Sequence, residues 1–476
     1  MKKRILNVNN IRKTINYLRK NGIKQAYYAA IERIEEVKKS DYIYEEPPKG
    51  LLLKQREEAG KLPYKFSIVV PAYETKEEYL RELIDSVLYQ SYENWELIIA
   101  DASLGDRVEK VVSEYLELRR PESRQPESEY SKSRERIKYI KLTENKGISE
   151  NTNAGIRAAT GNYIALLDHD DLITADALYE IANVIRIKEE GGNHPILIYS
   201  DEDKYDGKIV KEPHIKPEFN LDLILSNNYI CHLMVVETAC LKKLMLRGEY
   251  DGAQDYDLVL RVVSGLMDRV EIQKLKENII HVPKVLYHWR CHRNSTAENT
   301  ASKSYAYEAG KMALEDFCSS RNWQVQVSHA LHLGFYRIEY IPDMFTVRPD
   351  VGIIGGSMLD KYNKITSGMY NGNGENVYRG LHKEYSGGST HKASLVQECA
   401  AVDIRCMRLR SELQPLLEKI TGVSYKETGR LKLADISGIS CDEEGYKKLS
   451  MELCKAVEKS GYLVVWNPEI KRRFNK

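Results

Sequence analysis

Three aspartates follow an apolar run of β-forming residues in the segment YIALLDHDDLIT, residues 163–174. The carboxylates of Asp168, Asp170 and Asp171 lie within four positions, so they repel one another unless a cation neutralises them. Mg²⁺ typically binds one or two protein carboxylates and takes further ligands from the phosphates of a substrate. The pattern therefore favours a metal site that receives a nucleoside diphosphate. An exposed acidic turn before a helix near residue 175 is the alternative, because acids stabilise helix N-termini.

Four β-forming segments alternate with helical patterns before and within this region. The expected strands are 66–70, 95–100, 137–142 and 163–167, with helices at 77–91 and within 144–162. This alternation predicts a doubly wound α/β sheet with parallel strands. Ligands of such sheets bind beyond the carboxyl ends of the strands. Asp101 and residues 168–171 follow strand ends, so the acids stand where a ligand is expected.

Five motifs stand in a familiar order between about Lys65 and Thr296. They are SIVVPAYET, ELIIADAS, the glycine- and asparagine-rich helix, ALLDHDD and GAQDYDLVLR. Together they resemble the consecutive motifs of family 2 glycosyltransferases of the GT-A fold. IYSDEDK, SNNYICHL and VLYHWR narrow the resemblance to a bacterial subgroup that assembles rhamnan, capsule or O-antigen chains. The resemblance implies an α/β fold with a Rossmann-like mixed sheet and helices on both faces.

The resemblance also assigns residues to the nucleotide-sugar donor. The floor beneath the nucleoside would be formed by Pro71, Ala72 and Tyr73. Asp101 would accept a hydrogen bond from a uracil or thymine ring, which implies a UDP-sugar or a dTDP-sugar. In the DxD motif, Asp170 would contact the Mg²⁺ or Mn²⁺ ion, and Asp168 would contact the ribose or the metal. For Asp101, a cap of its own loop is the alternative.

The pair Gln254-Asp255 matches the motif that carries the catalytic base in this family. An acceptor hydroxyl needs a carboxylate within hydrogen-bond reach to take its proton, and the resemblance gives that role to Asp255. A helix cap at Asp255 is the alternative. By resemblance, His288 would reach the metal and Arg290 a phosphate of the donor, where a planar guanidinium suits two contacts. The alternatives for these two residues are a packed aromatic ring and a surface arginine.

The function implied by the resemblance is that of an inverting, metal-dependent hexosyltransferase acting on a glycan acceptor, which we expect to be lipid-linked. Asp201 and Asp203 are candidates for contact with the acceptor, although YSDEDKYDGK also predicts an acidic hairpin turn. A nucleotidyltransferase is disfavoured, because PAYETKEEY lacks the glycine-rich, arginine-containing loop that holds a triphosphate. A non-catalytic scaffold or nucleotide-sugar-binding subunit of a polysaccharide assembly complex is the second hypothesis.

The two ends of the chain differ from this central region. Residues 1–40 hold 11 Lys and Arg against 3 Glu, a balance of +8, and apolar residues recur at helical spacing. Such an arm either lies on an anionic membrane or packs on the main domain. Residues 351–468 resemble the later half of a second family domain, with Ser450 where a base is expected. We therefore predict an arm at 1–62, a GT-A domain at 63–330 and a degenerate, non-catalytic partial copy at 331–476. An unrelated small α/β domain is the alternative for the last part.

Composition limits the class of protein. A hydrophobic content of 42% and a charged content of 30% are typical of a globular chain. The net charge of +1 shows no preference for polyanions, so we expect no nucleic acid partner. Eight cysteines without a CxxC pair, and no recognisable signal peptide, favour reduced thiols in the cytoplasm. No apolar run approaches the roughly 18 residues of a membrane span, so we expect a cytoplasmic protein that can reach the inner face of the membrane.

Overall fold

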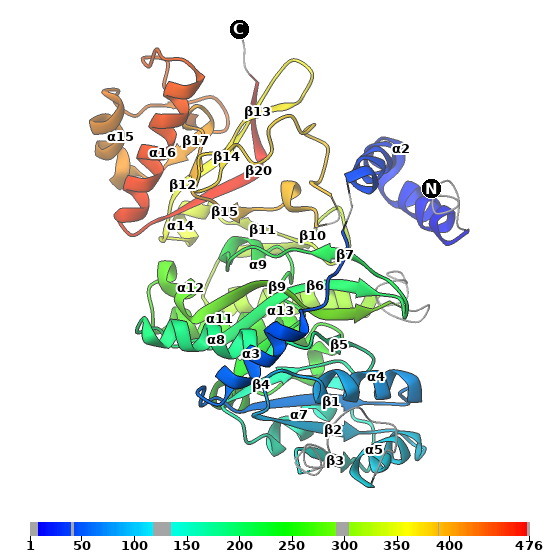
Figure 1. Cartoon of the computed structure of the whole chain (residues 1–476). Helices are drawn as coiled ribbons and strands as arrows, with labels where there is room; N and C mark the ends of the chain where they lie inside the picture. The colour runs from blue at the N-terminus through cyan, green and yellow to red at the C-terminus, as the bar shows by residue number, and fades with distance from the viewer. Residues whose placement is uncertain (1–7, 40–41, 118–134, 292–303, 389, 474–476) are drawn as a thin grey trace. The chain divides into compact units, whose positions relative to one another are not determined.

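The computed structural model of the 476-residue chain describes residues 8–39, 42–117, 135–291, 304–388 and 390–473 (Figure 1). The fold divides into two compact units. The nine-stranded unit comprises Tyr42–Phe219 and Asn228–Trp323. The C-terminal unit comprises Gln324–Lys476 together with Met1–Asp41 and Asn220–Asn227. The boundaries predicted at residues 62/63 and 330/331 stay predictions.

A mixed sheet forms the centre of the nine-stranded unit. Its strands are β1 (Phe66–Ala72), β2 (Trp95–Asp101), β3 (Ile137–Lys141), β4 (Tyr163–Leu166), β5 (Leu172–Ile173), β6 (Leu197–Tyr205), β7 (Val210–His214), β8 (Met234–Glu237) and β9 (Ile279–Arg290). They follow the order β3-β2-β1-β4-β8-β6-β9-β5, with β7 beside β6. Strands β1 to β4 run parallel as the alternation predicts, whereas β8 pairs antiparallel with both β4 and β6. The α/β class and the mixed sheet with helices are thus confirmed.

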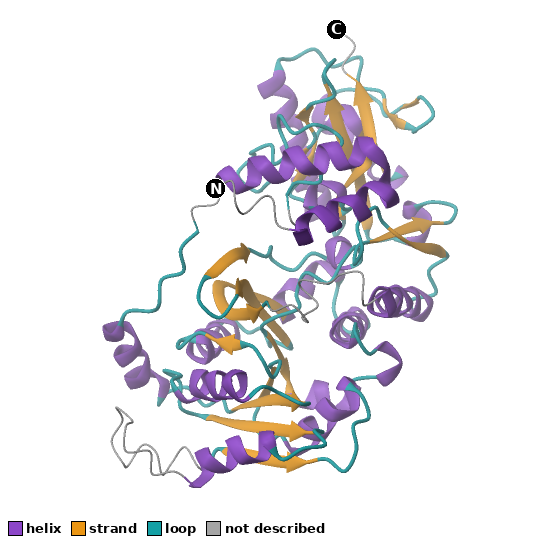
Figure 2. Cartoon of the chain, turned by 90° about the vertical axis from the view of Figure 1, so that its right-hand side faces the viewer, coloured by secondary structure: helices purple, strands orange, loops and turns teal. Residues whose placement is uncertain are grey.

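Helices cover both faces of this sheet (Figure 2). They are α3 (Lys49–Ala59), α4 (Glu77–Leu88), α5 (Arg107–Glu117), α7 (Ile148–Ala158), α8 (Ala177–Glu190), α10 (Thr238–Leu244), α11 (Gln254–Met267), α12 (Leu275–Asn278) and α13 (Ser304–Ser320). Apolar residues of α4, α5 and α8 share one core with β1 and β2. Helix α7 packs close to β1, because Gly155 has no Cβ: one added there would meet Val69 Cγ1 at 2.5 Å.

The C-terminal unit is built around a smaller, five-stranded sheet. Its central strand β12 (Val351–Leu359) runs parallel to β20 (Leu463–Arg473) and antiparallel to β13 (Ile365–Ser367) and β17 (Met407–Leu409), and β15 (Gln397–Glu398) pairs with β20. The other elements are α9 (Leu221–Ile224), β10 (Val325–His329), β11 (Tyr336–Tyr340), α14 (Met344–Val347), β14 (Met369–Tyr370), β16 (Ala401–Val402), α15 (Gln414–Thr421), β18 (Glu427–Thr428), β19 (Leu433–Ala434) and α16 (Glu443–Lys459). Ser450 is buried in α16 and donates to Tyr446 O at 2.7 Å, so its hydroxyl is part of the packing.

The basic arm forms helix α2 (Val8–Lys39), with a break at Gly22, whose φ is 80°. The carboxylate of Glu32 accepts hydrogen bonds from Gly387 N at 2.6 Å and Gly388 N at 2.9 Å. One face of α2 therefore packs on the C-terminal unit. Residues 1–7 of the arm lie outside the described residues. Within the described part of the chain, no helix is both long enough and apolar enough to cross a bilayer.

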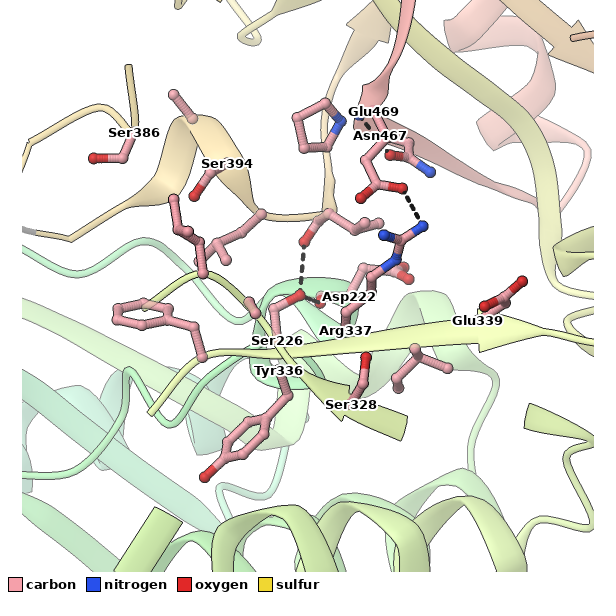
Figure 3. A pocket seen from close by; sticks show the side chains of 18 of the residues that line it. Asp222, Ser226, Ser328, Tyr336, Arg337, Glu339, Ser386, Ser394, Asn467 and Glu469 are labelled. Carbon is pink, nitrogen blue, oxygen red and sulfur yellow. Dashed lines mark hydrogen bonds and ion pairs between the residues drawn. The ribbon is translucent and has the colours of Figure 1, made fainter. Parts of the chain in front are cut away.

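A cavity of about 690 Å³ lies within the C-terminal unit (Figure 3). Residues of α9, of the β10–β11 hairpin and of β20 line it. Two ion pairs join residues of its lining: Arg337 contacts Glu469 at 2.6 Å, and Arg408 contacts Asp343 at 2.9 Å. The lining is thus rich in charged side chains of both signs.

Candidate functional site

The aspartates after β4 form a compact group with one histidine from a distant part of the chain. The ligand atoms of Asp168, Asp171 and His232 all lie within 4.8 Å of one another. Strand pairing explains this meeting. Leu166 of β4 stands opposite Met234 of β8 in an antiparallel ladder, so the residue two positions before Met234 lies beside the residue two positions after Leu166.

Strand β9 holds this group from one side. The ring of Tyr287 stacks on His232 with 4.7 Å between ring centroids and 8° between planes. The hydroxyl of Tyr287 donates to Asp171, and the same carboxylate accepts from Arg290 N at 2.6 Å. One strand therefore orients both the imidazole and a carboxylate of the group.

Arg290 is almost fully buried beside the aspartate turn. Its guanidinium donates to the backbone oxygen of Asp170 and to the carboxylate of Glu82, and it lies over the ring of Tyr79 at 4.4 Å. These contacts stabilise the backbone of the turn. The surface arginine considered as an alternative is therefore wrong, and the phosphate contact stays a prediction.

His288 lies outside the group of Asp168, Asp171 and His232. Its Nδ1 is 2.6 Å from Asp203 Oδ1, and its ring meets Tyr44 edge to face at 4.6 Å. Tyr42 donates to the other oxygen of Asp203 at 2.8 Å. The structure thus brings His232 to the aspartates, where the sequence had suggested His288.

The electrostatics of Asp168 and Asp171 are those of carboxylates that are desolvated and repel one another. Burial is the largest cause that raises the pKa of Asp168; His232 opposes this, and Asp170 and Asp255 add to it. Burial also raises the pKa of Asp171 well above its usual range, with further repulsion from Asp170 and Asp168. No lysine or arginine side chain among the described residues forms an ion pair with Asp168 or Asp171. A divalent cation would relieve this repulsion, and carboxylate oxygens are ligands that suit Mg²⁺ or Mn²⁺.

Asp255 stands in the first turn of α11 and belongs to the same site, because its charge acts on Asp168. Its Oδ2 accepts a hydrogen bond from Asn228 Nδ2 at 2.8 Å and lies 3.5 Å from Cys231 Sγ. Both contacts fall on one oxygen. The residue that caps α11 is Ala253, so Asp255 does not act as the cap that the sequence left open.

Asp101 ends β2 and is fully buried. Its Oδ1 accepts from Ser103 N at 2.8 Å, which closes its own loop. Its Oδ2 accepts from Tyr139 at 2.7 Å and from Lys141 Nζ at 2.9 Å. The loop-closing contact matches the alternative considered from sequence, and contact with a nucleobase stays a prediction.

The end of β1 lies next to Asp101 in the sheet. Ala72 is in register with Asp101, and Pro71 with Ala100. Ala72 is buried, whereas Tyr73 is 44% exposed. The backbone of residues 71–73 thus borders the carboxyl edge of the sheet, as the predicted nucleoside floor requires.

The segment YSDEDK is a buried strand, with the turn of the hairpin at residues 206–209. Asp201 accepts from His281 Nε2 at 2.8 Å, and Asp203 is bonded to His288 and Tyr42. Both carboxylates are buried and have partners within the fold, and the suggested acceptor contact for them stays a prediction. Glu202 pairs with the buried Lys216 at 3.1 Å; burial raises the pKa of Glu202, but the charge of Lys216 and other neighbours lower it below its usual range.

Comparison with known proteins identifies the domain. Residues 67–236 match the sequence model of Glycosyl transferase family 2. The chain is 38% identical over 252 residues to the uncharacterized protein y4gI of Sinorhizobium fredii, covering 52% of this chain and 25% of that one. It is 28% identical over 277 residues to the O-antigen biosynthesis protein RfbC of Myxococcus xanthus, covering 58% and 19%. The chain therefore spans a quarter or less of the length of these curated relatives.

Among solved structures, S. aureus TarS 1-349 in complex with UDP-GlcNAc aligns with a TM-score of 0.39 and 19% identity, covering 52% of this chain and 65% of that one. The family match and the mixed sheet show that the nine-stranded unit contains a family 2 glycosyltransferase domain of the GT-A fold.

Proposed function

We propose that this chain transfers a sugar from a nucleoside diphosphate sugar to a hydroxyl group of a glycan during the synthesis of a bacterial surface polysaccharide. The observation that carries the proposal is the meeting of Asp168, Asp171 and His232 with Asp255 in one site of a family 2 domain. The similarity to an O-antigen biosynthesis protein supports the class of product.

The metal expected from the family fits the residues present. Asp168, Asp171 and His232 are close enough to share one ion. Burial first, and then repulsion between neighbouring acids, raises the pKa values of both carboxylates, and a cation would offset both effects. Asp170, the ligand expected from the DxD motif, follows Asp168 in the same turn. A bound Mg²⁺ or Mn²⁺ would stabilise the charge that grows on the departing diphosphate.

Asp255 would act as the catalytic base. Asn228 and Cys231 both engage its Oδ2, so Oδ1 is the atom available to take the proton of the acceptor hydroxyl. Deprotonation on the side opposite the diphosphate makes the hydroxyl attack from that face, which inverts the configuration at the anomeric carbon. The buried thiol of Cys231, whose pKa is raised mainly by burial, remains protonated and donates.

The rim formed by residues 71–73 and Asp101 would receive the nucleoside. Uracil and thymine both have a ring N–H that can donate a hydrogen bond to a carboxylate. UDP-sugars and dTDP-sugars are therefore the donors to test. We expect a lipid-linked acceptor. The exposed face of α2 then offers contact with an anionic membrane, since Ile23 and Tyr27 are 80% and 61% exposed within a basic arm.

The test is a panel of UDP- and dTDP-sugars with a lipid-linked acceptor extract, run with Mn²⁺ and with EDTA. We expect transfer from one donor, abolished by EDTA. Asp255→Asn should lower the rate by about 10²- to 10⁴-fold while UDP binding persists, because a general base contributes that much. Equal loss of transfer and of UDP binding would contradict the role of Asp255. UDP binding without transfer in the unaltered protein would favour a nucleotide-sugar-binding subunit.

A further inference from the structure

Residues 228–232 form a loop that contacts both halves of the candidate site. Asn228 and Cys231 meet the carboxylate of Asp255, and His232 meets Asp168 and Asp171. The position of this loop therefore affects the distance between the proposed base and the proposed metal ligands. A displacement of the loop would move His232 and the groups that contact Asp255 at the same time.

Lys216 lies beneath this loop with a side chain that is 0% exposed. Its Nζ donates to Ile230 O at 2.6 Å and to His232 O. The same Nζ is 3.1 Å from Glu202 Oε2, and that oxygen accepts from His232 N at 3.3 Å. The pair of Lys216 and Glu202 thus makes three hydrogen bonds to the backbone of the loop.

A buried ion pair is a weak source of stability, because an apolar pair of similar volume often stabilises a fold equally well. The polar groups of this pair do something that an apolar pair cannot: they satisfy two backbone carbonyls and one backbone N–H. These contacts fix the loop on either side of Cys231, whose φ is 33°.

We propose that Lys216, held by Glu202, is a positioning residue that fixes the loop of residues 228–232 and thereby sets the geometry between Asp255 and the metal-binding group. This inference rests on the proposed function of that site. A displacement of about 1 Å in a reacting group costs about 10²-fold in rate.

Two variants and one control separate positioning from stability. Lys216→Met leaves Glu202 without its lysine partner and should lower both the melting temperature and the transfer rate. Lys216→Met/Glu202→Leu removes both charges, so the melting temperature should recover in part, although the backbone groups of the loop stay unsatisfied. The control is Lys204→Met, in the same hairpin, where Lys204 makes a surface pair with Glu212 at 2.9 Å.

We expect the double variant to remain about 10²-fold slower than the unaltered protein, with hydrogen exchange of the amides of residues 228–233 accelerated at least tenfold. Its affinity for Mn²⁺ alone, measured by titration, should fall about tenfold. Lys204→Met should change none of these. A double variant that regains the activity, the Mn²⁺ affinity and the slow exchange together with the melting temperature would overturn the proposal. Transfer absent from the unaltered protein would count against the proposed function, while exchange and Mn²⁺ affinity still decide the role of Lys216.

Discussion

Buried carboxylates are compensated differently in the two units. In the C-terminal unit, Arg348 is 0% exposed and contacts Asp222 at 3.1 Å and Asp350 at 2.6 Å. In the nine-stranded unit, Asp168 and Asp171 form no ion pair with arginine or lysine within the described residues. The first arrangement contains its own cation, whereas the second would gain from a cation supplied from outside, as the proposed function requires.

The same contrast holds for a second cluster of the C-terminal unit. Arg405 contacts Asp403 at 2.7 Å and Glu443 at 2.6 Å, and this arginine is the main cause that lowers the pKa of Glu443. Acids near strand ends are therefore not evidence of a site by themselves. What distinguishes the site is that, among the described residues, no lysine or arginine side chain forms an ion pair with Asp168 or Asp171.

The substitution Asp168→Asn tests the uncompensated cluster and should have the largest effect. Transfer should fall about 10³-fold, because several kcal/mol of transition-state stabilisation depend on the metal. The melting temperature in EDTA should rise, since one of the repelling charges is gone. Initial rates and thermal melts measure the two effects. Unchanged transfer, or a lower melting temperature in EDTA, would contradict the comparison.

The substitution Arg348→Met tests the compensated cluster. It leaves Asp222 and Asp350 buried without their partner, so the free energy of unfolding should fall by about 3 kcal/mol. Denaturant titration of the full chain measures the loss. Arg337→Ala is the matched control: Arg337 and Glu469 are both about half exposed (53% and 52%), and such pairs contribute about 0–1 kcal/mol. Similar losses for both variants would show that Arg348 does not compensate the buried acids.

Glu398, which interacts with Asp222 of the compensated cluster, should make the stability of the C-terminal unit depend on pH. Burial first, and then the charge of Asp222, raises the pKa of Glu398 from 4.5 to about 7. The folded chain then holds a proton that the unfolded chain loses between these values, so the free energy of unfolding falls as the pH rises through this window. The loss is about 3 kcal/mol at most. Unfolding titrations from pH 4 to 8 should show a slope that Glu398→Gln removes.

Glu96 gives the opposite and smaller pH dependence. Burial alone would raise its pKa, but hydrogen bonds from Lys138, Ser67, Thr160 N and Lys65 lower the pKa to about 2. Its contribution to stability is present above pH 4.5 and is lost as the pH falls through about 2. Because Lys65 and Lys138 are 37% and 39% exposed, we expect roughly 1–2 kcal/mol, screened by salt. In Glu96→Gln, the free energy of unfolding should fall less steeply as the pH is lowered from 4.5 to about 2. The same steepness in the variant and in the unaltered protein would contradict the role of Glu96.

Much of the fold of the nine-stranded unit was predictable, because strands and helices leave local patterns. The expected strands at 66–70 and 95–100 are β1 and β2, and the helix expected at 77–91 is α4. The parallel sheet inferred from alternation was incomplete: β8 runs antiparallel between β4 and β6. The direction of β8 depends on the path of the chain between β4 and β8, about seventy residues, and no short sequence pattern records that path.

The residues of the candidate site that lie within one short segment of the chain were predictable from the sequence. Asp168, Asp170 and Asp171 are neighbours in the chain, and Asp255 is marked by its motif. His232 is not marked in the sequence, because its neighbours show no metal-ligand spacing, although its place just before a strand that pairs with β4 is a usable signal. For the acids of YSDEDK the sequence offers acceptor contact or an acidic hairpin turn, because hydropathy alone does not show that they pair with buried partners.

The sequence by itself determined the α/β class, the family and the clustering of acids after β4, since each of these depends on residues close together in the chain. The tertiary structure alone decided that His232 meets Asp168, that Asn228 and Cys231 engage one oxygen of Asp255, and that Lys216 lies beneath their loop. For His232 and Asp168 the physical reason is register, because the pairing of β4 with β8 joins residues more than sixty positions apart. The other contacts depend on how the loop of residues 228–232 packs, and no local pattern in the sequence records that packing.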